Sequence, residues 1–162
     1  MNARAFFSAA SLVLAACTPN AVGSSSGGAG GGVTHTVDIN LTLSQPAPST
    51  YGQTGGFTPA IVMAKVGDTI VFKNTDSFAH TSTSIPVAET TNETQFPSKY
   101  PFNNPGEHPL SQSGNTLSGG WSSGEVQAGS TSQNVLVDKA GTYLFGCAIH
   151  YGAPMRGAIV AQ

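Results

Sequence analysis

The chain has 162 residues, which is enough for one ordinary domain and too few for two large ones. Charged residues make up only 9% of the sequence, which argues against a bundle of long helices with charged surfaces. The formal net charge is −2 and no basic run is present, so the sequence lacks the phosphate-neutralising charge of nucleic-acid-binding proteins.

The first 17 residues are predicted to be an export segment. Arg4 supplies a positive charge, and residues 5–16 form an apolar stretch that is too short to span a bilayer. The stretch ends in Leu14-Ala15-Ala16-Cys17, which resembles the lipobox of bacterial lipoproteins, where the cysteine is acylated and becomes the new N-terminus. The alternative is an ordinary signal peptide that is cleaved nearby.

Residues 18–32 are predicted to be a flexible linker. They are mostly Gly, Ser, Ala and Asn, and a chain of this composition is a coil with a root-mean-square reach of roughly 20 Å. A disordered end without a function would have the same composition. The acylation signal at Cys17 favours a tether that lets a folded body, residues 33–162, move near a membrane.

From residue 33 onward the apolar residues follow a period of two, which is typical of half-buried strands. Apolar and polar side chains alternate over residues 36–43, and residues 61–66 form a short apolar run that we expect to bury Met63. Further strands are predicted at residues 69–74, 134–137, 142–147 and 158–161. Short strands and Gly-rich turns without helical periodicity predict an all-β fold, a Greek-key β-sandwich. The expected core aromatic residues are Phe72, Trp121, Tyr143 and Phe145.

The stretch from Thr83 to Ser123 has a different composition. It is rich in Pro, Ser and Asn and has little periodicity, so we expect a long surface insertion with a helical turn near residues 87–91. A loop of this length in a compact domain is either functional or poorly ordered, and both alternatives stay open.

Four side chains from two separate parts of the chain form a candidate metal site. Cys147, His150 and Met155 lie in one short segment, and His80 follows a predicted strand and turn far upstream. A thiolate, two imidazoles and a weak axial thioether are the ligands of blue-copper electron-transfer centres. The soft thiolate bonds to copper, the imidazoles suit both oxidation states, and the thioether disfavours the tetragonal geometry of Cu(II). The sequence therefore predicts one copper ion at these four residues.

Other interpretations of the histidines and cysteines compete with the metal site. His35 and His108 are expected to be exposed rather than to bind the metal. Cys147 could be a buried free thiol, or it could pair with Cys17 in a disulfide, because the exported compartment is oxidising. The disulfide would destroy both the lipobox and the metal motif, which argues against it.

Two sequence blocks resemble the plastocyanin and pseudoazurin branch of the cupredoxins, which are type 1 copper proteins. One is the Cys-x-x-His-x-x-x-x-Met segment at residues 147–155, preceded by Ala-Gly-Thr-Tyr at 140–143 and followed by Gly157-x-Ile159-Val160. The other is residues 66–74, with His80 after it. The chain departs from the family at Thr81, where an Asn commonly ties the two ligand loops together.

The resemblance implies a carrier of single electrons rather than an enzyme. It implies redox protein partners, such as a c-type cytochrome or a membrane oxidase, and an electron port at the exposed edge of His150, framed by residues 151–154. With the lipobox at Cys17, the predicted location is the periplasmic or cell-surface side of a bacterial membrane.

Two other functions compete with electron transfer. A copper-binding or copper-delivery module would use the same ligands, but delivery proteins usually offer exposed, exchangeable ligand clusters. Residues 120–124 also match the Gly-x-Ser-x-Gly elbow of hydrolases, with Asp138 and His150 following in the hydrolase order. The elbow requires a strand-to-helix turn in a large α/β sheet, and this chain is too short to supply one.

Overall fold

The computed structural model describes residues 31–87, 95–102 and 109–162. The predicted export segment, nearly all of the predicted linker and His108 lie outside the described residues, and so does most of the helical turn expected near residues 87–91. Within the described part of the chain, no helix is both long and apolar enough to cross a membrane.

The described residues contain twelve strands. In chain order they are β1 (Thr34–Ile39), β2 (Ala47–Ser49), β3 (Gly52–Thr54), β4 (Phe57–Thr58), β5 (Ile61–Ala64), β6 (Thr69–Asn74), β7 (Thr83–Ser84), β8 (Gln112–Thr116), β9 (Gly120–Ser123), β10 (Val135–Leu136), β11 (Gly141–Gly146) and β12 (Arg156–Ala161).

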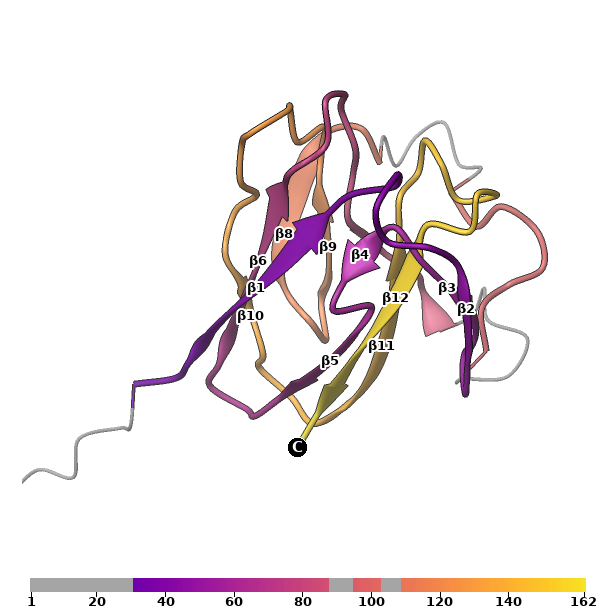
Figure 1. The fold of residues 1–162 in the computed structure, drawn as a ribbon. Coiled ribbons are helices and arrows are strands. Elements are labelled where there is room, and N and C mark those ends of the chain that lie inside the picture. The colour runs from indigo at the N-terminus through magenta and orange to yellow at the C-terminus, as the bar shows by residue number, and fades with distance from the viewer. Residues whose placement is uncertain (1–30, 88–94, 103–108) are drawn as a thin grey trace, which may run out of the picture.

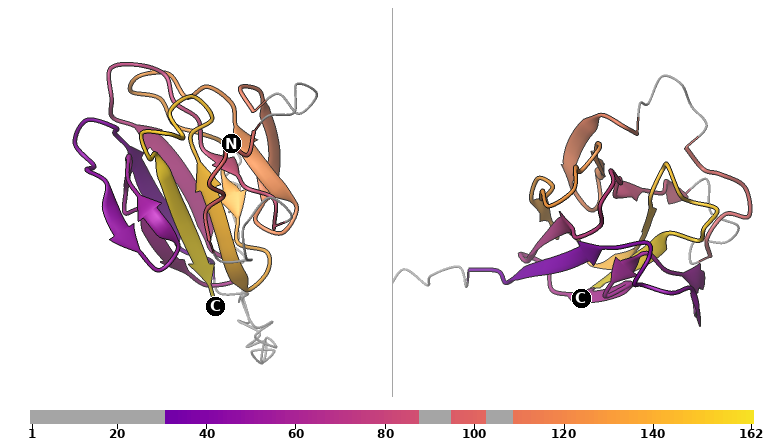
Figure 2. Two further views of the ribbon diagram at one scale, coloured as in Figure 1. Left: turned by 90° about the vertical axis from the view of Figure 1, so that its right-hand side faces the viewer. Right: turned by 45° about the horizontal axis from the view of Figure 1, so that its top comes forward.

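Ten of these strands form one sheet in the order β4-β1-β6-β10-β8-β9-β7-β11-β12-β5, and β2 and β3 form a separate hairpin. β1 also contacts β5, so the two sides of the sheet meet and enclose the core (Figure 1). In the left view of Figure 2, β11 and β12 lie side by side and lead into the loop that joins them. The predicted all-β sandwich fold is confirmed.

Aromatic rings fill the centre of the sandwich. Phe57 packs edge-on against Phe72 and Phe145, with ring centroids 6.2 and 4.9 Å apart, and Trp121 stacks on Phe72 at 6.3 Å. These rings are buried, and Tyr143 packs against them while remaining partly exposed. Aromatic pairs in such geometries stabilise a core beyond their buried area. The prediction of core aromatic residues is confirmed for Phe72, Trp121 and Phe145 and only in part for Tyr143.

Two predictions about the early strands are wrong in detail. β1 ends at Ile39, and Leu43 lies exposed in the turn that follows. In β5, Val62 and Ala64 are buried, whereas Met63 is 55% exposed. Alternate side chains of a strand point to opposite faces, and an apolar run without polar alternation does not show which face is inside.

The expected long insertion from Thr83 to Ser123 is also wrong in part, because the sheet includes β7, β8 and β9. β8 pairs with β9, for example Ser113 with Ser122, and β7 connects them to β11. The side chains of β8 are polar and mostly exposed, so this strand is built by backbone pairing and has no apolar pattern to reveal it.

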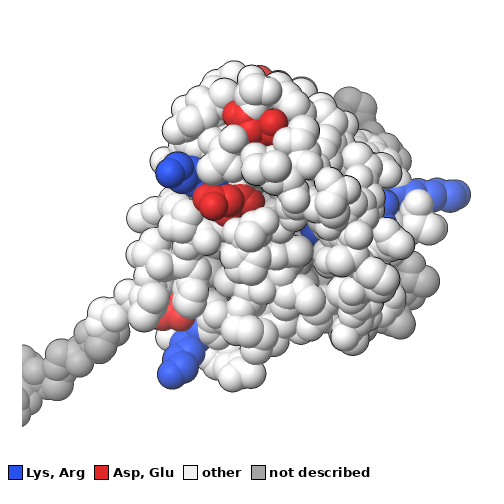
Figure 3. All heavy atoms as spheres, viewed as in Figure 1, with Lys and Arg blue, Asp and Glu red and all other residues white. Residues whose placement is uncertain are grey.

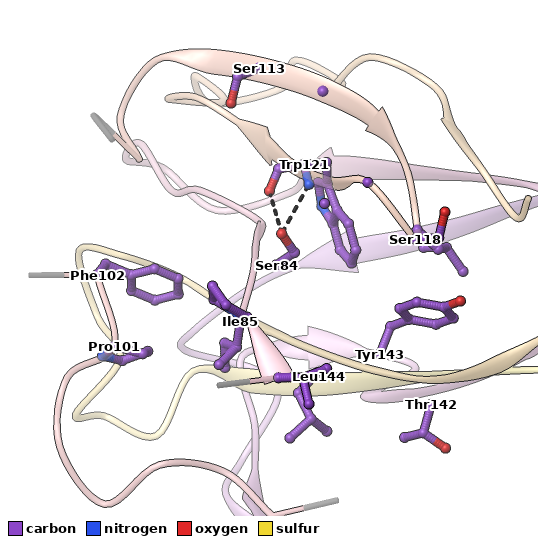
Figure 4. Close-up of a pocket in the computed structure, with 16 residues that line it drawn as sticks. Ser84, Ile85, Pro101, Phe102, Ser113, Ser118, Trp121, Thr142, Tyr143 and Leu144 are labelled. Carbon is purple, nitrogen blue, oxygen red and sulfur yellow. Dashed lines mark hydrogen bonds between the residues drawn. The ribbon is translucent and has the colours of Figure 1, made fainter. Parts of the chain in front are cut away.

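Residues 95–102 lie against the outer face of the sheet and build a second apolar cluster there. Its buried members are Ile85, Phe96, Phe102, Leu144, Ala148, Tyr151 and Ala158. Beside it lies a pocket of about 650 Å³, in which Figure 4 shows Phe102, Ile85 and Leu144 at one side. The pocket residues do not include any of the four predicted metal ligands.

Candidate metal centre

The strand pairing explains why distant parts of the chain meet. β11 ends at Gly146, directly before Cys147, and Gly146 pairs with Thr83 of β7. His80 precedes β7 by a few residues and forms backbone hydrogen bonds in both directions with Val126. His80 is therefore held beside Cys147 at the end of the sandwich where Figure 1 shows the loop between β11 and β12.

Three of the predicted ligands bring their donor atoms into one triangle. Cys147 Sγ lies 3.8 Å from His80 Nδ1 and 3.7 Å from His150 Nδ1, and the two ring nitrogens are 3.1 Å apart. Cys147 and His80 are fully buried, whereas His150 is partly exposed. Cys147 is a free cysteine. The arrangement is a closed group of one thiol and two imidazoles that could hold a metal ion.

Asp76 fixes the orientation of the His80 ring. Its Oδ2 lies 3.2 Å from His80 Nε2, and its carboxylate also accepts the Leu41 N–H at 3.0 Å. A ligand histidine commonly donates its other ring N–H to a carboxylate, which fixes the tautomer. Nδ1 of His80 is then left without a proton and faces the sulfur.

The protonation of this pair favours metal binding. Burial lowers the pKa of His80, and the hydrogen bond to Asp76 opposes this only in part. Burial alone would raise the pKa of Asp76, but the bonds from the Ser77 N–H, His80 and the Leu41 N–H lower it. The result is a neutral imidazole beside an ionised carboxylate, and a metal-binding histidine must be neutral.

Phe78 covers both imidazoles, although no sequence pattern had indicated it. Its ring centroid lies 4.7 Å from that of His80 and 5.5 Å from that of His150. The turn that carries it is held by Asn74, whose side-chain amide donates to the carbonyls of Phe78 and Val126 at 2.7 and 2.8 Å. Asn74 is fully buried. Phe78 therefore shields the site from water on one side.

Thr81 ties the two ligand loops together despite replacing the commoner Asn. Its N–H donates to Cys147 Sγ at 3.4 Å, and its hydroxyl oxygen accepts the Ala148 N–H at 2.8 Å. The two hydrogen bonds join the His80 side of the site to the Cys147 side. The departure from the family pattern thus keeps the connection and changes the group that makes it.

Met155 is fully buried in the same apolar cluster as Cys147. Its carbonyl accepts the Cys147 N–H at 3.1 Å, and its N–H donates to the His150 carbonyl at 3.3 Å. Gly56, with φ of +71°, leaves room for it, because a β-carbon there would lie 3.3 Å from Met155 Sδ and closer still to its Cγ. The loop therefore folds back and brings the backbone of Met155 against the backbones of Cys147 and His150.

The surface around His150 is apolar, but the residues that form it differ from those predicted. Ile149, Phe78, Gly152 and Ala153 are all exposed. Tyr151 was expected in this rim and is instead 3% exposed, with its hydroxyl bound to the Pro97 carbonyl. Charged side chains are few and scattered on the face drawn in Figure 3.

The remaining candidate residues lie in other settings. His35 is partly exposed and forms a pair with Asp68 away from the triangle, and it is not among the clustered donors. Ser122 of the elbow-like motif is buried in β9, donates to the Pro109 carbonyl at 2.6 Å and lies 3.0 Å from the Thr83 hydroxyl. A buried serine within a sheet has none of the exposure that a nucleophile elbow provides.

Comparison with known proteins agrees with this geometry. The family model described as copper binding proteins, plastocyanin/azurin family, matches residues 49–162. Among curated proteins, no sequence matches the chain.

Solved structures with a similar fold have low sequence identity to the chain. The novel purple cupredoxin from Nitrosopumilus maritimus is 18% identical, with a TM-score of 0.45, over 79% of this chain and 99% of that one. The oxidised plastocyanin from Dryopteris crassirhizoma is 16% identical, with a TM-score of 0.44, over 79% and 100%. The Cu(I) form of an amicyanin mutant is 18% identical, with a TM-score of 0.42, over 80% and 82%.

Proposed function

The chain belongs to the plastocyanin/azurin family of copper-binding proteins, the cupredoxins, with one copper ion as cofactor, and from this we propose that it carries single electrons at a membrane surface. The observation that carries the proposal is the triangle of Cys147 Sγ and the Nδ1 atoms of His80 and His150, with sides of 3.1 to 3.8 Å.

The donor set fits copper. Donor atoms about 2.0–2.3 Å from one first-row metal ion in a trigonal plane lie roughly 3.5–4 Å apart. Both distances to Cys147 Sγ fall in this range, and the two imidazole nitrogens are somewhat closer. One thiolate and two imidazoles belong to the ligand set of blue-copper centres, so Cys147, His80 and His150 would hold the ion, and Met155 is the candidate for the weak thioether ligand of that set.

When bound, copper supplies a one-electron couple, Cu(I)/Cu(II). The protein's own groups provide the rest of what electron transfer requires. Asp76 and Thr81 orient the ligands through hydrogen bonds, and Phe78 excludes water from one side. The ligands of a site held by buried side chains in this way move little when the metal gains or loses an electron. A small reorganisation of the ligands favours fast electron transfer.

The exposed edge of His150 is the proposed port for electrons. It is surrounded by an apolar rim that includes Ile149 and Phe78. Transient redox partners meet through small interfaces, and a net charge of −2 provides no strong field to steer them. We propose that the partners are redox proteins such as a c-type cytochrome or a membrane oxidase.

The proposed anchor is an acyl group on Cys17, followed by the linker at residues 18–32. The first described strand begins at the end of the sandwich opposite the metal triangle. There the Val33 N–H donates to Asp68, and the Val66 N–H donates to the carbonyl of Gln162. A tether entering at this end leaves the rim around His150 free to meet a partner.

The anchor has a simple test. Cys17→Ser is expected to move the exported protein from the membrane fraction to the soluble fraction, because the acyl group is lost. Cys147→Ser is the matched control and should remain with the membrane. Equal amounts of both variants in the membrane fraction would contradict the lipid anchor.

A copper-delivery role is the second candidate, because it would use the same ligands. The burial of Cys147 and His80 favours electron transfer, since delivery requires ligands that an acceptor can reach. The two roles are distinguished by voltammetry and by the rate of copper release to a chelator. A reversible one-electron wave with slow release supports electron transfer, and fast release without a wave supports delivery.

A further inference from the structure

Residues 95–102, here called the clamp segment, are bound to the ligand loop, which is residues 147–155. The hydroxyl of Tyr100 donates to the carbonyl of Ala148 at 2.7 Å. In the other direction, the hydroxyl of Tyr151 donates to the carbonyl of Pro97 at 3.0 Å. Each segment thus supplies one donor and one acceptor to the contact.

Arg156 joins the clamp segment, the ligand loop and β12. Its guanidinium carbon lies 3.9 Å from the ring centroid of Tyr151 and 5.8 Å from that of Phe96. Its Nε also donates to the Tyr151 carbonyl at 3.1 Å. Cation–π contacts of this kind hold the ring in place, so Tyr151 is fixed through its ring, its hydroxyl and its backbone.

The aromatic rings of the two segments pack together next to the cysteine ligand. Tyr100, Phe102 and Tyr151 are in mutual edge-on contact, with centroids 5.3, 6.1 and 5.7 Å apart. Tyr151 also lies on the backbone of Gly146, because a β-carbon there would be 3.0 Å from its Cδ2. The clamp segment therefore packs, through Tyr151, on the residue that immediately precedes Cys147.

The hydrogen bond from Tyr100 fixes one side of Ala148, and Thr81 fixes the other. The Ala148 N–H donates to Thr81 Oγ1 at 2.8 Å, while the Ala148 carbonyl accepts from Tyr100. The peptide groups on both sides of the Ala148 α-carbon are thus held, which restricts both of its backbone dihedrals. Thr81 in turn donates its N–H to Cys147 Sγ.

We propose that Tyr100 is a positioning residue of the metal centre, through which the clamp segment holds the ligand loop closed over Cys147 before the metal binds. The consequence for the metal-free protein is a shielded thiol, and the consequence for the copper-loaded protein is slower loss of the ion. Only the second consequence rests on the proposed function.

The test uses the full chain with Tyr100→Phe, which removes the hydroxyl and keeps the ring. Tyr143→Phe is the matched control, because the Tyr143 hydroxyl also donates to a backbone carbonyl, that of Lys139, at 3.0 Å. In the metal-free protein, alkylation of Cys147 by iodoacetamide is followed by peptide mass mapping. Loss of one hydrogen bond is expected to speed this alkylation about threefold to tenfold, with no change in the control.

A second measurement and a second variant keep the result decisive. Copper release from the reduced protein to a chelator should accelerate by a similar factor in Tyr100→Phe. If Tyr100→Phe fails to fold, Tyr151→Phe takes its place. This variant removes the hydrogen bond to Pro97 and should likewise speed the alkylation of Cys147. Rates of Cys147 alkylation equal to wild type in the folded variants would overturn the inference, even if the wild-type protein binds copper. If Tyr100→Phe speeds alkylation but the wild-type protein never forms a copper–thiolate band, Tyr100 still positions the loop over Cys147, and the copper site is refuted.

Discussion

Two histidine–aspartate pairs lie at opposite ends of the sandwich. Near the chain's first described strand, His35 Nε2 lies 2.8 Å from Asp68 Oδ2, and at the other end His80 Nε2 lies 3.2 Å from Asp76 Oδ2. The His35 side chain is 28% exposed, whereas that of His80 is fully buried. The residue types and the bonded atoms are the same, so these alone do not distinguish a metal ligand.

The second ring nitrogen and the role of the carboxylate make the difference. His80 Nδ1 faces the sulfur of Cys147, at 3.8 Å. Asp68 mainly organises a turn, since it accepts the N–H groups of Val33 and Lys65, each at 2.8 Å. The His80–Asp76 pair thus orients a metal ligand, whereas the His35–Asp68 pair helps to hold the backbone at the start of the fold. Whether a histidine of such a pair can bind a metal therefore depends on the group that its second ring nitrogen faces.

The largest expected difference between the pairs concerns the histidines themselves. His80→Gln removes a donor of the triangle and is expected to abolish the visible copper–thiolate band. We expect copper affinity to fall by more than about a hundredfold, which exceeds the usual loss for residues that only orient a ligand. His35→Gln should keep the band and the affinity. Optical titration with Cu(II) measures both, and equal behaviour of the two variants would remove the distinction between the pairs.

The aspartates give the next effect. Asp76→Asn keeps the size of the side chain but removes the charge that orients His80, so copper affinity is expected to fall about tenfold to a hundredfold. Asp68→Asn should leave copper affinity unchanged. Competition with a chromophoric chelator measures the affinities. A fall of the same size in Asp68→Asn would show that general stability, and not ligand orientation, is responsible.

The buried and the exposed methionine extend the comparison. Met155→Leu is expected to keep the visible band and raise the reduction potential, because the apolar side chain no longer donates electron density that stabilises Cu(II). Met63→Leu is the matched control, since Met63 is exposed on β5. Voltammetry of both variants checks this. An unchanged potential in Met155→Leu would exclude Met155 as a copper ligand.

The smallest expected effect is the pH dependence of Asp68. Its hydrogen bond with His35, followed by those from the Lys65 and Val33 N–H groups, lowers the pKa of Asp68 from 3.8 to about 2. Its contribution to stability is therefore fully present above pH 3.8 and is lost as the pH falls toward 2. In thermal unfolding of the metal-free protein, the advantage of wild type over Asp68→Asn should shrink over that interval. A difference that stays constant with pH would contradict this assignment.

The sequence predicted the strands whose side chains alternate clearly. β6 has the predicted bounds, and its inward residues Ile70 and Phe72 are buried, Phe72 as predicted. β8 was not predicted because its Gln, Ser, Gly, Asn and Thr residues have no apolar face, and only backbone pairing with β9 and β10 makes it a strand. The prediction for Met63 failed because an unbroken apolar run indicates no inward direction.

At the metal centre, ligand spacing identified the residues that meet, but not those that support them. His80, Cys147 and His150 could be selected because few residue types bind copper and their spacing resembles a known family. Asp76 and Phe78 lie in a turn whose shape depends on buried Asn74, which no local pattern reveals. Contacts between segments distant in sequence are set by tertiary packing, and this is also why the burial of Tyr151 was missed.

The central claim is that Cys147, together with His80 and His150, binds one copper ion that takes up and releases one electron. The most direct measurement is optical titration of the full chain with Cu(II), followed by a reductant and an oxidant. The account predicts an intense visible thiolate-to-copper band that saturates at one copper per chain, disappears on reduction and returns on oxidation, and is absent from Cys147→Ser. A band that persists in Cys147→Ser, or copper-loaded wild-type protein without one, would contradict it.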